Sequence, residues 1–418
     1  MQDQTPHNRG SGQGDSAYLD HASTSPLRPE ALAAMLPFLT EHFGNPSAVN
    51  APGRRARLAV DEARDQVAES LGCSAGEVVF CSGGTEAANL AVLGALAGAR
   101  RDEPGSRFVC SAVEHPCVLK TVESTSGATV STGADGIIDL DRLTEILSET
   151  PPVAGVAVML ANNEVGTIQP IAEVAQIARR RAPGAVVVVD AVHAAPWLDV
   201  ASISREVQPE ILFVSAHKFG GPKGVGALMV RAGTRWAPTR TGGAQERGRR
   251  PGTENVASIV GMAAALTATV GGRPEDCARV AGMRDRLADG LLAALPGVTE
   301  TAVSGAGSVS TSPPRRTGTA GREKKVPGSC HLLIDGVEQD ELLFLLDSDG
   351  VYASAGSACA SGASEPSHVL HAMGVPDANA PLRLSLGYST TQAEIDHALK
   401  VLPKVVEHLR SFNRKTFS

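Results

Sequence analysis

Reactive side chains follow five short apolar runs in the first half of the 418-residue chain. The fifth run, at 211–217, includes Ser215 and His217 near its end and is followed directly by Lys218. A lysine at the end of a buried strand is unfavourable unless its amine is partnered or used covalently, because loss of water lowers the pKa toward that of a working amine. The sequence therefore singles out Lys218 as a candidate catalytic amine.

Groups that bind or react also stand at the ends of the four earlier runs, at 77–82, 107–113, 155–162 and 185–192. In chain order, they are Gly84 and Thr85 after the first run, His115 after the second, Asn163 after the third, and Asp190 and His193 at the end of the fourth. Each of these residues alone is also explained as a helix cap or a buried hydrogen-bonding group, and the glycine turn lacks both G-x-G-x-x-G and the Walker pattern. Five such strand ends in succession are hard to explain as independent caps.

Together these residues describe a site for pyridoxal 5′-phosphate. The cofactor needs a lysine for its aldehyde, a carboxylate for its ring nitrogen, hydroxyls and a helix N-terminus for its phosphate, and a flat group against its ring. Lys218 would bind the aldehyde, and Asp190 the ring nitrogen. Thr85, Ser215 and His217 would bind the phosphate, and His115 would lie against the ring. Lys223, the other lysine near a strand end, lies in a Gly-Pro-Lys-Gly turn that we expect to face solvent.

The five runs are rich in β-branched residues and are separated by helix-length segments, which is typical of a mostly parallel sheet with crossover helices. Ligands bind beyond the carboxyl ends of such strands, so the reactive segments are expected at one edge. The predicted fold is α/β: a large cofactor-binding domain at 31–260 and a smaller α+β domain at 17–30 and 261–418. The smaller domain is predicted to contain a long helical stretch over about 261–295, then shorter strands and two more helices.

Two segments are predicted to lie outside these domains. Residues 1–16 are expected to form a disordered tail, and 304–328 a flexible surface loop, since the latter is rich in Ser, Gly, Pro and basic residues without periodicity. For this loop a solvated linker is favoured over a basic protein-docking segment.

The composition excludes several classes of protein. A hydrophobic fraction of 42% predicts a globular chain, while a net charge of −7 with few aromatic residues argues against nucleic-acid binding. The polar N-terminus and the lack of an 18-residue apolar run argue against a signal peptide or membrane span. Seven cysteines without a C-x-x-C pair predict neither a disulfide framework nor a zinc ribbon, which favours a cytoplasmic enzyme without metal.

The chain resembles the NifS/IscS-type cysteine desulfurases, the class V branch of the aspartate-aminotransferase (type I) fold, from Tyr18 to about Arg410 apart from the loop at 304–328. The motifs that carry this resemblance are Phe43-Gly44-Asn45-Pro46-Ser47, Ser82-Gly83-Gly84-Thr85-Glu86, Asn162-Asn163-Glu164-Val165-Gly166, Ser215-x-His217-Lys218, Arg250-Pro251-Gly252-Thr253 and Ala355-Gly356-Ser357-Ala358-Cys359-Ala360-Ser361.

The resemblance implies roles for individual residues. Lys218 would form the Schiff base with the cofactor, His115 would stack on its ring and act as an acid or base, and Asn163 would lie beside the ring oxygen and the substrate. The protein would be a homodimer in which Thr253 reaches the phosphate of the neighbouring subunit. Arg383 would bind the substrate carboxylate.

His193 departs from the family pattern. The family usually has Gln at this position, next to the ring oxygen of the cofactor. Histidine can supply the same donor, but its own protonation leaves the pH dependence of that bond open.

Cys359 lies in the run of small residues Ala355–Ser364, which has little to bury and is expected to form a mobile loop. A thiol in such a loop is better suited to act as a nucleophile than to pack in a core. The resemblance, here to the branch with an extended catalytic loop, implies that Cys359 takes the sulfur of L-cysteine as a persulfide and leaves L-alanine. Sulfur would then pass to an acceptor protein, such as an iron–sulfur scaffold or a tRNA-thiolation enzyme.

Two alternatives remain at this stage. A selenocysteine lyase or another class V transaminase would share the cofactor site, although a transaminase needs no loop thiol. A degenerate scaffold without turnover would have no need of intact Lys218, Asp190, Arg383 and Cys359. The sequence does not name the sulfur acceptor.

Overall fold

The computed structural model describes residues 16–149, 152–303, 321–356, 366–376 and 379–416. Cys359 lies outside the described residues, and so do most of the predicted loop at 304–328 and nearly all of the predicted tail at 1–16.

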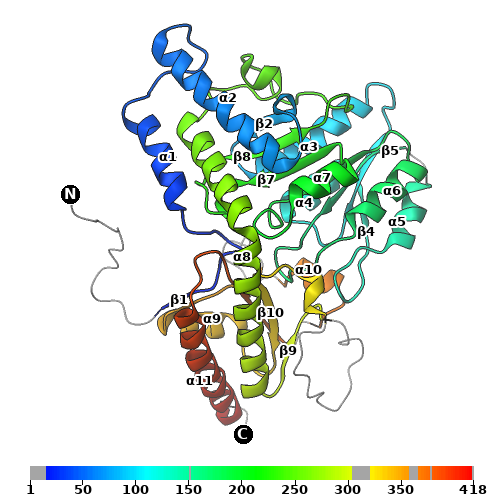
Figure 1. Ribbon diagram of the computed structural model, residues 1–418. Helices are drawn as coiled ribbons and strands as arrows, with labels where there is room; N and C mark the ends of the chain where they lie inside the picture. The colour runs from blue at the N-terminus through cyan, green and yellow to red at the C-terminus, as the bar shows by residue number, and fades with distance from the viewer. Residues whose placement is uncertain (1–15, 150–151, 304–320, 357–365, 377–378, 417–418) are drawn as a thin grey trace, which may run out of the picture.

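A seven-stranded sheet forms the centre of the larger part of the molecule (Figure 1). Its strands, in spatial order, are β2 (Val78–Cys81), β8 (Gly226–Val230), β7 (Ile211–Ser215), β6 (Val186–Asp190), β5 (Val153–Met159), β3 (Arg107–Ser111) and β4 (Ala128–Val130). The neighbours from β7 to β4 are parallel, and β8 is antiparallel to both β2 and β7. The sheet is therefore mostly parallel, as predicted, and β2 points the same way as the parallel strands.

Helices cover both faces of this sheet, because alternate residues of each strand enter different cores. Val187 and Val189 of β6 belong to one core, and Val186 and Val188 belong to the other. The first core includes α2 (Ala51–Leu71), α5 (Leu140–Leu147), α6 (Ile171–Arg181) and α7 (Val200–Val207), and the second includes α3 (Gly84–Ala99) and α4 (Pro116–Ser124). The predicted crossover helices are thus present.

The smaller part contains an antiparallel sheet of β12 (Ala380–Ser385), β10 (Ser329–Ile334) and β9 (Val298–Glu300). Near it, β1 (Ala17–Tyr18) pairs in parallel with β11 (Val351–Tyr352). Three helices follow β10 in the described residues, one more than expected: α9 (Gln339–Ser348), α10 (His368–Ala372) and α11 (Gln392–Thr416). With five residues, α10 is too short to show a helical period in the sequence.

The long helix α8 (Val256–Ala294) runs through both parts of the molecule. In Figure 1 its upper end lies beside α1 (Pro29–Thr40) and α2, and its lower end beside α11. Among the described helices it alone is long and apolar enough to cross a membrane, but 56% of its apolar stretch is buried inside the protein, which is typical of a core helix. It starts before the predicted domain boundary at 260, and the predicted division stays a prediction.

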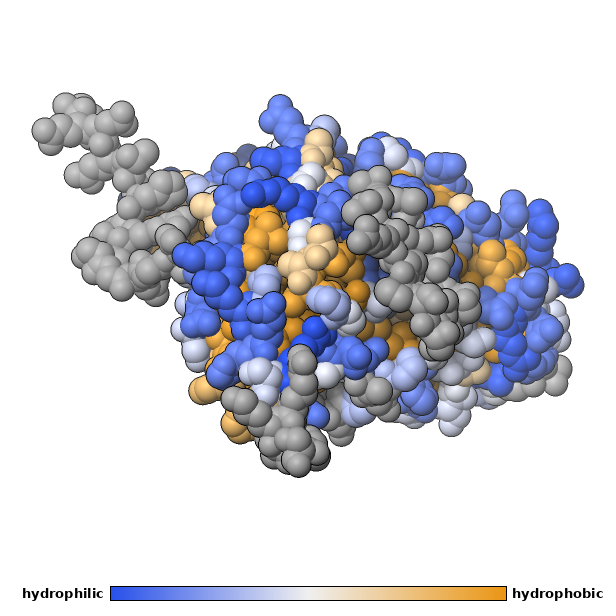
Figure 2. Space-filling view, turned by 90° about the horizontal axis from the view of Figure 1, so that it is seen from below, coloured by the Kyte–Doolittle hydropathy of each residue, from blue (hydrophilic) through white to orange (hydrophobic). Residues whose placement is uncertain are grey.

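Apolar residues are not confined to the interior. Viewed from below, hydrophobic residues gather in the middle of the face and hydrophilic residues surround them (Figure 2). Several large apolar side chains of the described chain are more than half exposed.

Candidate active site

The reactive segments meet at one edge of the large sheet. Because β2, β3, β5, β6 and β7 all point in the same direction, their carboxyl ends lie together. Gly226 of β8 pairs with both Cys81 at the end of β2 and Ser215 at the end of β7. This pairing brings the glycine turn next to Ser215, and a Cβ added to Gly83 would lie 3.7 Å from Ser215 Oγ.

The glycine turn forms the N-terminus of α3. Gly83 has a φ of 146°, which disfavours any residue with a side chain, and the helix begins at Gly84. Thr85 is exposed in the first turn, and the buried Ser215 lies beside Gly84. Helix N-terminal N–H groups beside hydroxyls are a setting that binds phosphate.

Lys218 ends the short turn Ala216–Lys218 that follows β7. Its Nζ donates hydrogen bonds to the carbonyl oxygens of Ala22 and Ser23, the latter at 2.9 Å. The amine is therefore held by the segment that follows β1. Lys223 is exposed in the turn before β8, as predicted.

Asp190 ends β6 and is only 6% exposed. Burial raises the pKa of its carboxyl to about 6, although the Lys218 ammonium and a 2.8 Å hydrogen bond from the Val192 N–H favour the charged form. A cation placed against this carboxylate would remove the penalty of burying it.

His193 is 8% exposed and follows β6 on the same edge. Burial, followed by the charges of Lys218 and Arg383, lowers its pKa to about 3, so the ring is neutral. Its Nε2 is buried without a hydrogen-bond partner among the described residues. A buried polar atom in that state indicates a ligand that supplies the partner.

His115 is the N-cap of α4. Its Nδ1 accepts a hydrogen bond from the Cys117 backbone N–H at 3.2 Å and lies 3.0 Å from Cys117 Sγ. Burial, followed by the charge of Lys218, lowers the pKa of the ring to about 4. The ring is therefore neutral, and because Nδ1 accepts a hydrogen bond, its proton is on Nε2. A neutral ring with one N–H donor suits the stacking role predicted for His115.

His217 also lies in the turn after β7, with Nδ1 3.3 Å from Thr24 Oγ1. Burial lowers its pKa to about 4. Like Lys218, it is connected to the segment after β1, which sequence reasoning had assigned no role in the site.

Arg383 comes from β12 of the smaller part and is 2% exposed. Its Nη1 donates to the Asn163 carbonyl at 3.1 Å, and its Nη2 donates to Asp20 Oδ1 at 2.8 Å and to Ser23 Oγ at 2.7 Å. The Nε atom is buried without a partner among the described residues. The guanidinium expected to bind a substrate carboxylate is thus already paired with a carboxylate, that of Asp20.

Glu114 is a second buried acid that sequence reasoning missed. It precedes His115, is fully buried, and accepts the Met159 N–H at Oε1 with a distance of 2.9 Å. Burial raises the pKa of its carboxyl well above the usual range, and the negative charge of Asp190 adds to this. Burial therefore favours the protonated form of Glu114, whose carboxyl is held by the end of β5.

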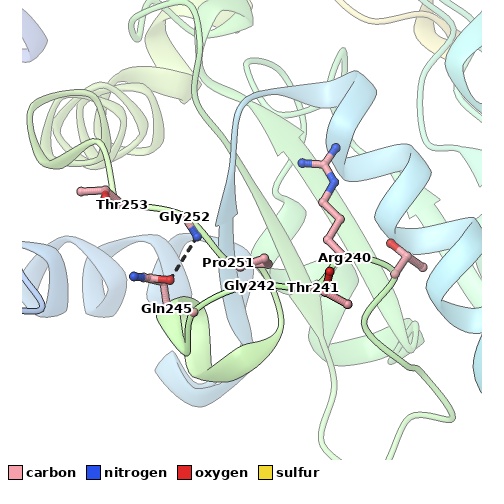
Figure 3. A pocket seen from close by; sticks show the side chains of 9 residues that line it. Arg240, Thr241, Gly242, Gln245, Pro251, Gly252 and Thr253 are labelled. Carbon is pink, nitrogen blue, oxygen red and sulfur yellow. Dashed lines mark hydrogen bonds between the residues drawn. The ribbon is translucent and has the colours of Figure 1, made fainter.

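Thr253 lies elsewhere on this chain. It lines an open hollow of about 740 Å³, and the lining contains none of the other predicted site residues (Figure 3). Within the lining, the Gly252 N–H donates to Gln245 Oε1 at 3.1 Å. Arg240 and Arg250 connect this segment to Glu86 in the first turn of α3, with N–O distances of 2.6 and 3.0 Å.

Comparison with known proteins decides the family. Residues 17–398 match the model of the class V aminotransferases. The chain belongs to the class V aminotransferase family. Within it, the chain falls among the NifS- and IscS-type cysteine desulfurases, which confirms the resemblance carried by the motifs.

Relatives in this family cover nearly the whole chain. An IscS-like cysteine desulfurase of Mycobacterium tuberculosis is 43% identical over 404 residues, which is 94% of this chain and 97% of the relative. A cysteine desulfurase of Cereibacter sphaeroides is 41% identical over 408 residues, which is 96% of this chain and 98% of the relative. The solved structure of a NifS-like protein has a TM-score of 0.82 at 30% identity and covers 94% of this chain and 100% of that one. A structure of SspA in complex with cysteine has a TM-score of 0.73 at 27% identity, with coverages of 90% and 100%.

Proposed function

We propose that this protein is a pyridoxal-phosphate-dependent cysteine desulfurase that converts L-cysteine to L-alanine and transfers the sulfur to Cys359. The observation that carries the proposal is the meeting of Lys218, Asp190, His193 and His115 at one edge of the sheet. Membership of the class V aminotransferases supports it.

The residues at this edge fit the cofactor. Asp190 is a buried carboxylate with a raised pKa, and the protonated ring nitrogen would supply the cation that it needs. His193 Nε2, which has no partner among the described residues, would bind the ring oxygen. Gly84 and Thr85 begin α3, and Ser215 lies beside Gly84. Together with His217 in the turn after β7, these residues would hold the phosphate. Bound to Lys218, pyridoxal phosphate supplies an electron sink for the substrate.

The protein's own groups then have defined tasks. Asn163 and Arg383 would hold the carboxylate of L-cysteine. For this, the Asp20 carboxylate must release Nη2, or the substrate must use Nε, which has no partner among the described residues. The amine of Lys218, once released, would move protons at the substrate. His115 would donate from Nε2.

Sulfur transfer balances as a displacement at the substrate sulfur. The Cys359 thiolate forms the S–S bond as the substrate Cβ–S bond breaks, and the electron pair left on Cβ takes a proton, which gives alanine. Five of the six described thiols suit this task less well, because burial raises the pKa values of Cys73, Cys81, Cys110, Cys277 and Cys330.

The proposed enzyme is a homodimer. One face of α1 carries Leu32, Leu36 and Leu39 at 52%, 54% and 61% exposure, and Phe43 and Val49 after it are 83% and 89% exposed. The opposite side of α1 packs on α8, so this apolar face is open in a single chain. A second copy placed over it would be the source of the Thr253 that completes the neighbouring phosphate site.

Cys359→Ser tests the proposed function. The variant is expected to bind pyridoxal phosphate and to change its absorption spectrum with L-cysteine, but to release no sulfide in the presence of dithiothreitol and to form no persulfide. Cys277→Ser, which changes a thiol with a raised pKa far along the chain, is the matched control and should keep most activity.

If Cys359→Ser releases sulfide at the wild-type rate, the loop thiol is not the acceptor, and a lyase that eliminates sulfur directly takes the place of the desulfurase. The sulfur-acceptor protein and a cytoplasmic location stay predictions. Pull-down of acceptors by the persulfidated protein addresses the first.

A further inference from the structure

Arg383 is surrounded by hydrogen-bond acceptors of the protein itself. Its side chain is 2% exposed, and Nη1 donates to the carbonyl oxygens of Asn163 and Gly356 at 3.1 and 2.9 Å. Nη2 donates to Asp20 Oδ1 at 2.8 Å and to Ser23 Oγ at 2.7 Å. Each of these nitrogens carries two hydrogens, so both are fully used, and Nε has no partner among the described residues.

Asp20 supplies the negative charge beside this guanidinium. Within the described chain, no other acidic group is at salt-bridge distance from Arg383. The other acceptors are carbonyl and hydroxyl oxygens, which are neutral, and a buried cation is unfavourable without an anion. The Asp20 carboxylate, 21% exposed, therefore stabilises Arg383 in its charged form.

The backbone around Asp20 is fixed to the strand that carries Arg383. Asp20 forms a parallel bridge with Ser385 of β12, two positions after Arg383. The Ser385 N–H donates to the Leu19 carbonyl at 2.7 Å, and the His21 N–H donates to the Ser385 carbonyl at 3.1 Å. Because an aspartate side chain is short, its carboxylate cannot move far from Nη2 while these bonds hold.

The segment that contains Asp20 also holds the proposed covalent lysine. Lys218 Nζ donates to the carbonyl oxygens of Ala22 and Ser23, the latter at 2.9 Å. Ser23 thus accepts from Lys218 through its carbonyl and from Arg383 through its hydroxyl. L-cysteine carries its amine and its carboxylate on one carbon, so the groups that bind them must keep a fixed spacing.

We propose that Asp20 is a positioning residue for the substrate: it stays on Nη2 of Arg383 when L-cysteine binds, and the substrate carboxylate accepts from Nε. The proposal rests on the proposed desulfurase function, in which Arg383 binds that carboxylate. A buried N–H without a partner indicates a ligand that supplies one, and Nε is in that state. If the substrate displaced Asp20 from Nη2 instead, the two carboxylates would compete, and removal of Asp20 would strengthen binding.

The test compares L-alanine, the expected product, with ethylamine, which is L-alanine without its carboxylate. Each is titrated into the full-length protein loaded with pyridoxal phosphate, and the cofactor absorption gives the half-saturating concentration without turnover. Asp20→Ala removes a hydrogen bond to a charged group, so it should raise this concentration about tenfold for L-alanine and leave it within about twofold for ethylamine. Sulfide release from L-cysteine should show a matching rise in KM with little change in kcat.

Two conservative variants separate the placement of Arg383 from the stability of the protein. Asp20→Asn removes the anion but keeps an oxygen that accepts from Nη2, so it should unfold at a lower urea concentration yet bind L-alanine nearly as the wild type does. Asp20→Glu keeps the anion, which protects folding, but places it one methylene further from the backbone, so L-alanine should bind several-fold more weakly. A role in stability alone predicts the reverse order.

Two further proteins serve as references. In a chain that already carries Arg383→Ala, Asp20→Ala should cause no further loss of L-alanine binding, because Asp20 acts through Arg383. Asp289→Ala is the matched control, since Asp289 is another partly exposed acid whose Oδ1 lies 2.9 Å from a buried arginine, Arg322. It should bind both ligands as the wild type does.

The inference is overturned if Asp20→Ala binds L-alanine as the wild type does, or if L-alanine and ethylamine are weakened equally. Tighter binding of L-alanine by Asp20→Ala or Asp20→Asn also overturns it, because Asp20 would then be a competitor of the substrate. A loss in Asp20→Asn as large as that in Asp20→Ala would assign the effect to charge and not to position. A loaded wild-type protein whose absorption responds to neither L-alanine nor L-cysteine defeats the proposed function instead.

Discussion

Asp190→Asn separates stability from function at the candidate site. Asn is nearly the same size as Asp and keeps an oxygen to accept the Val192 N–H, but it carries no charge. In protein stripped of pyridoxal phosphate, the substitution removes a buried carboxylate whose burial the Lys218 charge offsets only in part. We therefore expect the variant to be more stable without the cofactor and to lose activity with it.

The magnitude follows from the pKa of Asp190. Burial raises it from the ordinary 3.8 to about 6, so the charged form is disfavoured in the folded protein. The folded state therefore loses stability as the pH rises from 3.8 through 6, and the loss is complete above 6. A tenfold change in proton affinity corresponds to about 1.4 kcal/mol, which makes the full penalty about 3 kcal/mol at pH 7.5 and about 1.6 kcal/mol at pH 5.

The assay is urea unfolding of both stripped proteins at pH 7.5 and pH 5. The buried amide of Asn offsets part of the gain, which leaves about 1 to 2 kcal/mol at pH 7.5. This offset is independent of pH, so the difference between variant and wild type should shrink by about 1.4 kcal/mol at pH 5. A difference that stays constant with pH, or a variant that is less stable at pH 7.5, would refute the argument that burial raises this pKa.

Three further predictions concern the cofactor and the dimer. Lys218→Ala should lose the visible absorption of lysine-bound pyridoxal phosphate without unfolding, and Lys223→Ala should keep it; the reverse result would reassign the covalent lysine. His193→Gln should leave the pH profile of sulfide release unchanged between pH 6 and 9, because a ring with a pKa of about 3 is neutral throughout; a profile displaced by half a pH unit would contradict this. Light scattering of the loaded protein should give twice the mass of one chain, and Thr253→Ala should weaken cofactor retention several-fold; a fully loaded monomer would rule out a shared phosphate site.

Residues at the strand ends could be predicted from the sequence, because parallel strands place their carboxyl ends at one edge. An apolar run marks each strand, and the residue after it is automatically at that edge. This simple rule led to Lys218, Asp190 and His115 without knowledge of which strands are neighbours. The order of the strands, with β8 inserted between β2 and β7, was not needed for the prediction.

Tertiary structure decided which buried groups have partners. Asp20 and Arg383 are separated by 363 positions and meet because the segment after β1 bridges to the end of β12 at Ser385. No local pattern therefore reveals that the proposed substrate arginine is already paired. Glu164 looks like an ordinary acid after Asn163 until Ser367 is seen against it. Local sequence determines where a strand ends, whereas the burial and charge state of a side chain depend on what distant segments place around it.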